Sequence, residues 1–167
     1  ERAFSQQVYQ YSTNGSATGS SYTRYYYQNI AVISLNSSGV IDWAQKIPKL
    51  QVTNRDGGFY SSYALAIVKD KLHFIFNDHP KNLVTKPGKL HNFSLKKNKA
   101  LVVLVTIDSQ GNQKKQPLFL GADAQTITRP KVCEQISDTK LVVFGQRKRK
   151  QRLAKLNFGA SRHLSNR

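Results

Sequence analysis

The side chains able to do metal, nucleophilic or acid–base chemistry are few in this sequence and widely spaced. The four histidines are His73, His79, His91 and His163, and no two of them have the i, i+4 spacing of ligands on one helix. Cys133 is the only cysteine, and as a nucleophile it would need a base held beside it by the fold. We therefore expect no metal site and no cofactor, and we expect Cys133 to be a small buried hydrophobic residue.

Carboxylates are also scarce. The only glutamates are Glu1 and Glu134, and most of the seven aspartates lie at predicted turns, which argues against a two-carboxylate glycosidase. The sequence has no G-x-S-x-G motif, no phosphate-binding glycine loop and no EF-hand loop. Asp78 and His79 follow a predicted strand, where binding loops often lie, but we favour the interpretation that Asn77 and Asp78 cap a turn. We expect a protein that is not an enzyme.

Positive charge is the strongest chemical signal in the sequence. The net charge is +17, of which residues 1–83 contribute +3 and residues 84–167 contribute +14. Such a field favours anionic partners. We predict that the basic runs of the second half form an anionic-partner binding surface, made of Lys96, Lys97, Lys99, Lys114, Lys115, Arg147, Lys148, Arg149, Lys150 and Arg152.

Several kinds of partner fit this charge. An acidic protein face, or an anionic glycan or lipid surface, is the interpretation we favour, and a basic surface that is simply solvated explains the same charge. A nucleic-acid-binding protein is the alternative, but binding of that kind usually combines charge with aromatic stacking. Only Phe144 and Phe158 lie near the last basic run, and both occupy predicted core positions.

The elements that must position these charges are predicted by an internal repeat. Residues 30–39 recur as residues 102–111, a spacing of 72, and residues 71–76 resemble residues 140–144. Valine and isoleucine runs broken at short intervals by Gly, Asn and Asp favour strands over helices throughout. The predicted strands are 28–35, 40–47 (ended by Pro48), 62–68, 72–77, 100–107 (buried on both faces), 113–120, 131–137, 140–144 and 152–158.

Four strands per unit is the pattern of propeller blades, so we predict an all-β fold of two blades plus one strand, a sector of a larger propeller. A β-sandwich is the alternative. We expect a linker or loop over 1–20, a first β-repeat unit over 21–98, a second over 99–150, and a closing strand with a basic tail over 151–167. The sequence contains no methionine and no apolar run long enough to span a membrane. We therefore expect the remainder of a longer chain, or another protein, to complete the β-architecture.

The segment Gly39-Val40-Ile41-Asp42-Trp43 resembles the G-x-x-x-W hairpin of quinoprotein-like and tachylectin-like propeller repeats, in which Gly makes the turn and Trp packs between adjacent sheets. The second unit has Gly111 but Lys115 where the tryptophan would fall. Residues 56–62, 74–78 and 129–133 extend the resemblance to uncharacterised secreted or envelope-associated bacterial proteins with propeller-like repeats. The resemblance covers about residues 22–158; it implies an extracellular or envelope location and adds no expectation about catalysis. The sequence thus predicts a non-enzymatic binding or structural module of a bacterial envelope or extracellular assembly, docking an anionic partner through its basic half.

Overall fold

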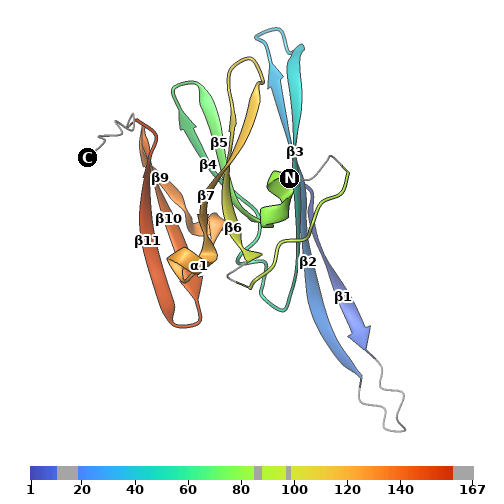
Figure 1. The fold of residues 1–167 in the computed structure, drawn as a ribbon. Helices are drawn as coiled ribbons and strands as arrows, with labels where there is room; N and C mark the ends of the chain where they lie inside the picture. Colours follow the sequence, from blue (N-terminus) through green and yellow to red (C-terminus); the bar gives the residue numbers. More distant parts are fainter. Residues whose placement is uncertain (11–18, 85–87, 97–98, 160–167) are drawn as a thin grey trace, which may run out of the picture.

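The computed structural model describes residues 1–10, 19–84, 88–96 and 99–159, in which strands are the main secondary structure (Figure 1). The strands are β1 (Ala3–Gln10), β2 (Ser20–Leu35), β3 (Ile41–Asn54), β4 (Ala64–Val68), β5 (Lys71–Asp78), β6 (Leu101–Ile107), β7 (Gln113–Leu120), β8 (Ile127–Thr128), β9 (Glu134–Ser137), β10 (Lys140–Arg147) and β11 (Lys150–Asn157). The helical elements are one α-helical turn, α1 (Gly121–Ala124), and the 3-10 turns η1 (Pro80–Leu83) and η3 (Pro130–Val132). The prediction of an all-β protein is confirmed.

The strands are organised into three antiparallel sheets. Sheet A has the order β1-β2-β3, and sheet B has the order β4-β5-β6-β7. In sheet C, β10 pairs with β11 on one side and with both β8 and β9 on the other. Figure 1 shows the sheets side by side with sheet B in the middle. There are three sheets, whereas the alternative β-sandwich has two.

The central strands of sheet B, β5 and β6, are buried on both faces because a separate hydrophobic core covers each face. Between sheets A and B, Ile30 and Ile47 pack with Phe74, Phe76 and alternate residues of β6. Between sheets B and C, Leu141 and Val143 pack with residues of three strands of sheet B. These are alternate residues of β4, Ile75 of β5, and Val102 and Leu104 of β6. The apolar run of β6 thus serves two cores at once, as predicted for a strand buried on both faces.

The sequence repeat corresponds to two hairpins, β2–β3 and β6–β7, that close with the same turn. Asn36 in one and Asp108 in the other accept hydrogen bonds through Oδ1 from the main-chain N–H groups two and four residues later. Gly39 and Gly111 have φ angles of 78° and 81°, a left-handed conformation that glycine adopts without steric cost. The repeat therefore encodes a turn as well as the strand before it.

Trp43 joins the first of these hairpins to the second. Its Nε1 donates to the carbonyl oxygen of Ser109 at 3.0 Å, and its ring lies so close to Gly111 that a β-carbon there would be 2.8 Å from the indole. Trp43 belongs to sheet A and Gly111 to the turn of sheet B. The packing of this tryptophan between adjacent sheets, expected from the G-x-x-x-W pattern, is what the structure shows.

The sheets do not coincide with the sequence units. Sheet B combines β4 and β5, which lie within residues 21–98, with β6 and β7, which lie within residues 99–150. Its four strands are nevertheless consecutive and paired in chain order, as in a propeller blade. The first repeat unit begins with the β2–β3 hairpin, which is the last hairpin of sheet A, and the second begins with the β6–β7 hairpin, the last of sheet B. The boundaries of the sheets are therefore offset from those of the repeat by one hairpin.

Two local expectations are wrong. Residues 1–20 include β1, which pairs with β2 over the full length Ala3–Gln10, whereas a linker or loop was expected there. β3 continues through Pro48 to Asn54, whereas Pro48 was expected to end the strand. The register shifts at this proline, because Pro48 and Lys49 together lie opposite Asn29, whose Oδ1 accepts the N–H of Lys49. A bulge in β3 thus accommodates the proline.

Candidate functional site

The hairpin formed by β10 and β11 carries the densest positive charge of the described chain. Arg147 and Lys150 are the last paired residues, so Lys148 and Arg149 form a two-residue turn. Lys148 has a φ of 52°, which lets the chain reverse within this short turn. Because the turn is so short, it brings four consecutive cations together at one end of sheet C.

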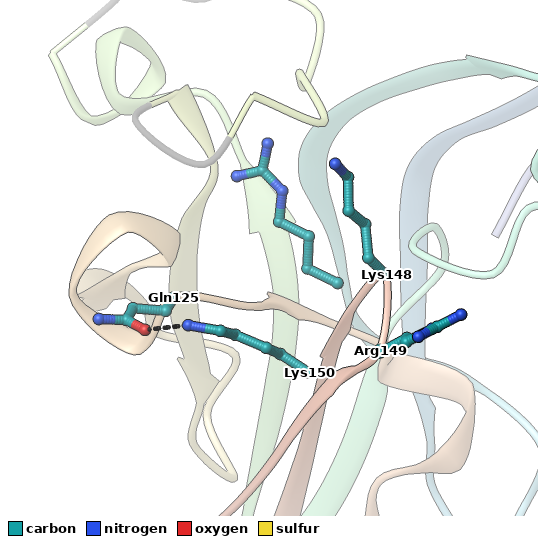
Figure 2. Close-up of a pocket in the computed structure, with 5 residues that line it drawn as sticks. Gln125, Lys148, Arg149 and Lys150 are labelled. Carbon is teal, nitrogen blue, oxygen red and sulfur yellow. Dashed lines mark hydrogen bonds between the residues drawn. The ribbon is translucent and has the colours of Figure 1, made fainter.

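These residues line a surface hollow of about 510 Å³ together with Gln125 (Figure 2). Gln125 follows α1 in a left-handed conformation, and its Oε1 accepts a hydrogen bond from Lys150 Nζ at 2.9 Å. In Figure 2 the side chain of Lys150 extends toward Gln125, while Lys148 and Arg149 point in other directions. The cations diverge, so the arrangement suits an extended anionic surface better than one small anion.

The charge of this hairpin is not neutralised within the described part of the chain. The ion pairs there are Lys49–Glu1 and Lys115–Asp78, and neither involves Arg147, Lys148, Arg149, Lys150 or Arg152. Arg152 lies opposite Gly145 in the adjoining part of β11 and is exposed. The cations of the hairpin are therefore available to an external partner.

The lysines preceding β6 lie toward the same end of the molecule. Lys96 and Lys99 are exposed in the loop that leads to β6, and Lys97 lies outside the described residues. The carbonyl oxygen of Ala100 accepts the N–H of Gly121 at 2.7 Å, which joins this loop to the first residue of α1. The same helical turn ends at the Gln125 of the hollow, so this loop and the hairpin are linked through α1.

Lys114 and Lys115 do not join this group. Lys114 is exposed beside the β6–β7 turn, at the opposite end of the sheets from the β10–β11 turn (Figure 1). Lys115 forms an ion pair with Asp78 Oδ2 at 2.6 Å, and its Nζ lies 5.8 Å from the centre of the Phe76 ring. The predicted residues thus divide into a group around the β10–β11 hairpin, an isolated exposed lysine and a lysine engaged in packing.

A buried polar cluster joins all three sheets, and the sequence analysis did not identify it. Lys49 Nζ pairs with Glu1 and donates to Gln51 Oε1 at 2.9 Å, although Lys49 is only 1% exposed. Gln51 Nε2 donates to the carbonyl oxygen of Asn77, and Asn77 Nδ2 donates to that of Thr128, each at 2.7 Å. These contacts run from β3 through β5 to β8. We call this set of five residues the polar junction.

The polar junction links strands of the three sheets through buried side chains. Burial lowers the pKa of the Lys49 ammonium, and the carboxylate of Glu1 opposes that shift. The sequence does carry a signal for this cluster, because Lys49, Gln51 and Thr53 continue the inward-facing alternation of Ile47 along β3. A strand whose inward positions change from apolar to polar indicates a polar layer beside the core.

The turn after β5 is capped differently from the prediction. Asp78 Oδ1 accepts the His79 N–H and the Asn82 Nδ2 group, at 2.8 and 2.6 Å, but the cap of η1 is His79, whose Nδ1 accepts the N–H of Lys81. Asn77 instead contributes to the polar junction. Within the described residues, no three His, Cys, Asp or Glu side chains are placed to hold a metal ion, and His163 lies outside them.

Cys133 has a structural environment. Its side chain is half-buried and packs against the core between sheets B and C. Burial raises the pKa of the thiol, which disfavours the thiolate that nucleophilic chemistry needs. The Sγ atom contacts the Arg129 carbonyl at 3.3 Å and accepts the Phe144 N–H at 3.4 Å. The residue thus behaves as the small packing residue that was expected, although it is not fully buried.

Comparison with protein-family models, with curated proteins and with solved structures finds no match to this chain. Among the helices of the described residues, none has the length and apolar character needed to cross a bilayer.

Proposed function

We propose that this protein is a non-enzymatic binding module whose β10–β11 hairpin docks an anionic partner. The observation that carries the proposal is the clustering of Arg147, Lys148, Arg149, Lys150 and Arg152 on one hairpin without a described ion pair. An uncompensated group of cations raises the local potential and attracts an anionic surface. The rigid stack of three sheets holds the hairpin in place through the core between sheets B and C.

The hydrogen bonds of the buried polar residues support a binding role over a catalytic one. The side chains of Lys49, Gln51 and Asn77 form hydrogen bonds that join the sheets. Asp78 is bound to Lys115 and to Asn82 of η1. The one cysteine is held in its protonated form by burial. The resemblance to envelope-associated repeat proteins supports the further proposal that the partner is an acidic protein or polymer of a bacterial envelope.

The proposal is tested with poly-L-glutamate as the anionic probe, measured by calorimetry. The variant Lys148→Glu/Arg149→Glu should bind about tenfold or more weakly, because two cations of the hairpin become anions. The matched control is Lys69→Glu/Lys71→Glu, at the β4–β5 turn: it makes the same change in net charge and also replaces one left-handed lysine (φ 49° at Lys69). The control should bind nearly as well as the native protein.

Equal weakening in both variants would show that net charge alone drives binding, and the proposed site would be abandoned. A DNA duplex and a single-stranded RNA, titrated at about 50 and 200 mM salt, examine the nucleic-acid alternative. If one of these nucleic acids binds sequence-selectively and still binds at the higher salt concentration, the partner is a nucleic acid and the proposal of an acidic protein or polymer is wrong. The cations of the hairpin can contact the phosphates of a duplex. The ring of Phe144, however, is partly buried and lies under the Arg129 guanidinium, so it is poorly placed to stack on a base.

A further inference from the structure

The outer edge of β11 is a strand edge without a partner in the described residues. β11 pairs with β10 over the whole length Lys150–Asn157, and no described strand pairs with its other side. The corresponding strands of the repeat, β2 and β6, each pair with a following strand, β3 and β7. Among the described residues, β11 therefore lacks the following partner strand that β2 and β6 have.

The main-chain groups at this edge can be assigned. Phe158 donates its N–H to the carbonyl oxygen of Thr139, directly opposite. In an antiparallel ladder such hydrogen-bonded pairs alternate with non-bonded ones, so Leu156, Ala154 and Arg152 also turn their main-chain groups toward β10. Every second residue between them turns its N–H and carbonyl groups to the open edge; these residues are Gln151, Leu153, Lys155 and Asn157.

A groove runs beside this edge. It has a volume of about 440 Å³ and is lined on one side by residues 155–158 of the β11 segment. The other side is sheet B, with Leu104, Leu118, Thr106 and His73 among the lining residues. An added strand would pair with β11 and place alternate side chains over Leu104 and Leu118, as Ile47 of β3 packs against sheet B from sheet A.

Charge decides which strand fits. β11 carries three cations and no acidic residue. Lys150 and Arg152 alternate with Leu153 and share the face of Leu156, toward sheet B, whereas Lys155 lies on the outer face. Acidic side chains on the outer face of the incoming strand would therefore be opposite or diagonal to Lys155. A second copy of this chain would bring the same positive charge to the edge. Residues 160–167 contain two arginines and a histidine and no acidic residue, so their charge does not complement β11 either.

We propose that the open edge of β11 binds an extended segment of a partner protein in which apolar and acidic residues alternate, by addition of a strand to sheet C. The apolar residues would fill the groove against sheet B, and the acidic residues would meet Lys155 on the outer face of β11. This inference rests on the proposed function and deepens it, since it gives the anionic partner a conformation and a register.

The test uses a peptide of about ten residues that alternates valine and glutamate. Amide exchange followed by NMR should show new protection at Leu153 and Lys155, whose N–H groups point outward, and little change at Ala154, which is already bonded to β10. The variant Leu153→Pro removes one outward N–H without breaking the β10 ladder and should weaken binding about tenfold or more. Its matched control, Leu153→Ala, keeps the N–H and should bind like the native protein.

The outcomes separate this inference from the function on which it rests. If poly-L-glutamate binds and depends on Lys148 and Arg149 while the peptide leaves β11 unprotected, the docking hairpin stands and strand addition is wrong. Strand addition is equally wrong if Leu153→Pro binds the peptide as tightly as Leu153→Ala. A peptide alternating valine and lysine should not bind, and binding by it would exclude the charge complementarity. If no anionic probe binds, the proposed function itself fails.

Discussion

The turn glycines Gly39 and Gly111 differ in what a β-carbon would meet, although their main-chain angles are nearly the same. A β-carbon at Gly39 has no atom within 4 Å, whereas one at Gly111 lies 2.8 Å from the ring of Trp43. Gly39→Ala should therefore lower the free energy of unfolding only by the left-handed strain, about 1–2 kcal/mol. Gly111→Ala should add the cost of displacing the indole, about 1–3 kcal/mol more.

Chemical denaturation of the two variants measures this difference directly, because the left-handed term is common to both and cancels. Trp43 fluorescence gives a second readout, since the ring must move in Gly111→Ala and need not move in Gly39→Ala. Equal destabilisation of the two variants would show that the contact between Trp43 and Gly111 contributes nothing to the joining of sheets A and B.

At the scale of elements, the edge of β4 is closed by a side chain instead of a strand. Gln135 of β9 accepts the N–H of Ile67 and donates to its carbonyl oxygen, each at 2.9 Å, as an opposing main-chain residue would. Gln135→Ala should lower the free energy of unfolding by about 1–2 kcal/mol and speed amide exchange at Ile67, because both main-chain groups lose a partner. Gln151→Ala, on the exposed face of β11, is the matched control and should change neither. Unchanged exchange at Ile67 in Gln135→Ala would contradict this role.

The elements that the sequence predicts well are those whose pattern is local. β6 is identifiable because both of its faces are apolar, and the β2–β3 and β6–β7 turns because each combines Asn or Asp with a glycine three residues later. β1 is missed because its serine and glutamines show no alternation with apolar residues, and its strand conformation comes from pairing with β2. The grouping of strands into sheets is not local at all, so the repeat fixes the hairpins without fixing the sheet boundaries.

At the scale of the whole molecule, the same limit applies to the candidate site. The basic runs are evident in the sequence, but their positions depend on which ends of the sheets the turns occupy. Lys114 lies beside a turn at one end and Lys148 at the other, and Lys115 of β7 pairs with Asp78 of β5 within sheet B. The sequence did not reveal the polar junction for a related reason, because its members come from residue 1 and from three strands far apart in the sequence.

The net charge of +17 should make the stability of the molecule depend on salt. Like charges repel in the folded state, and this repulsion is greatest where the cations are closest, at the β10–β11 hairpin. Raising the salt concentration from about 50 to 500 mM shortens the screening distance and should raise Tm by a few degrees. In Lys148→Glu/Arg149→Glu this rise should be clearly smaller, because the substitutions replace local repulsion by attraction.

Lys69→Glu/Lys71→Glu lowers the net charge equally but leaves the hairpin intact, so it should keep more of the salt-dependent rise. Thermal unfolding of the three proteins at both salt concentrations makes the comparison; the same reduced rise in both variants would mean that the repulsion is spread over the whole surface and that the hairpin is not its centre.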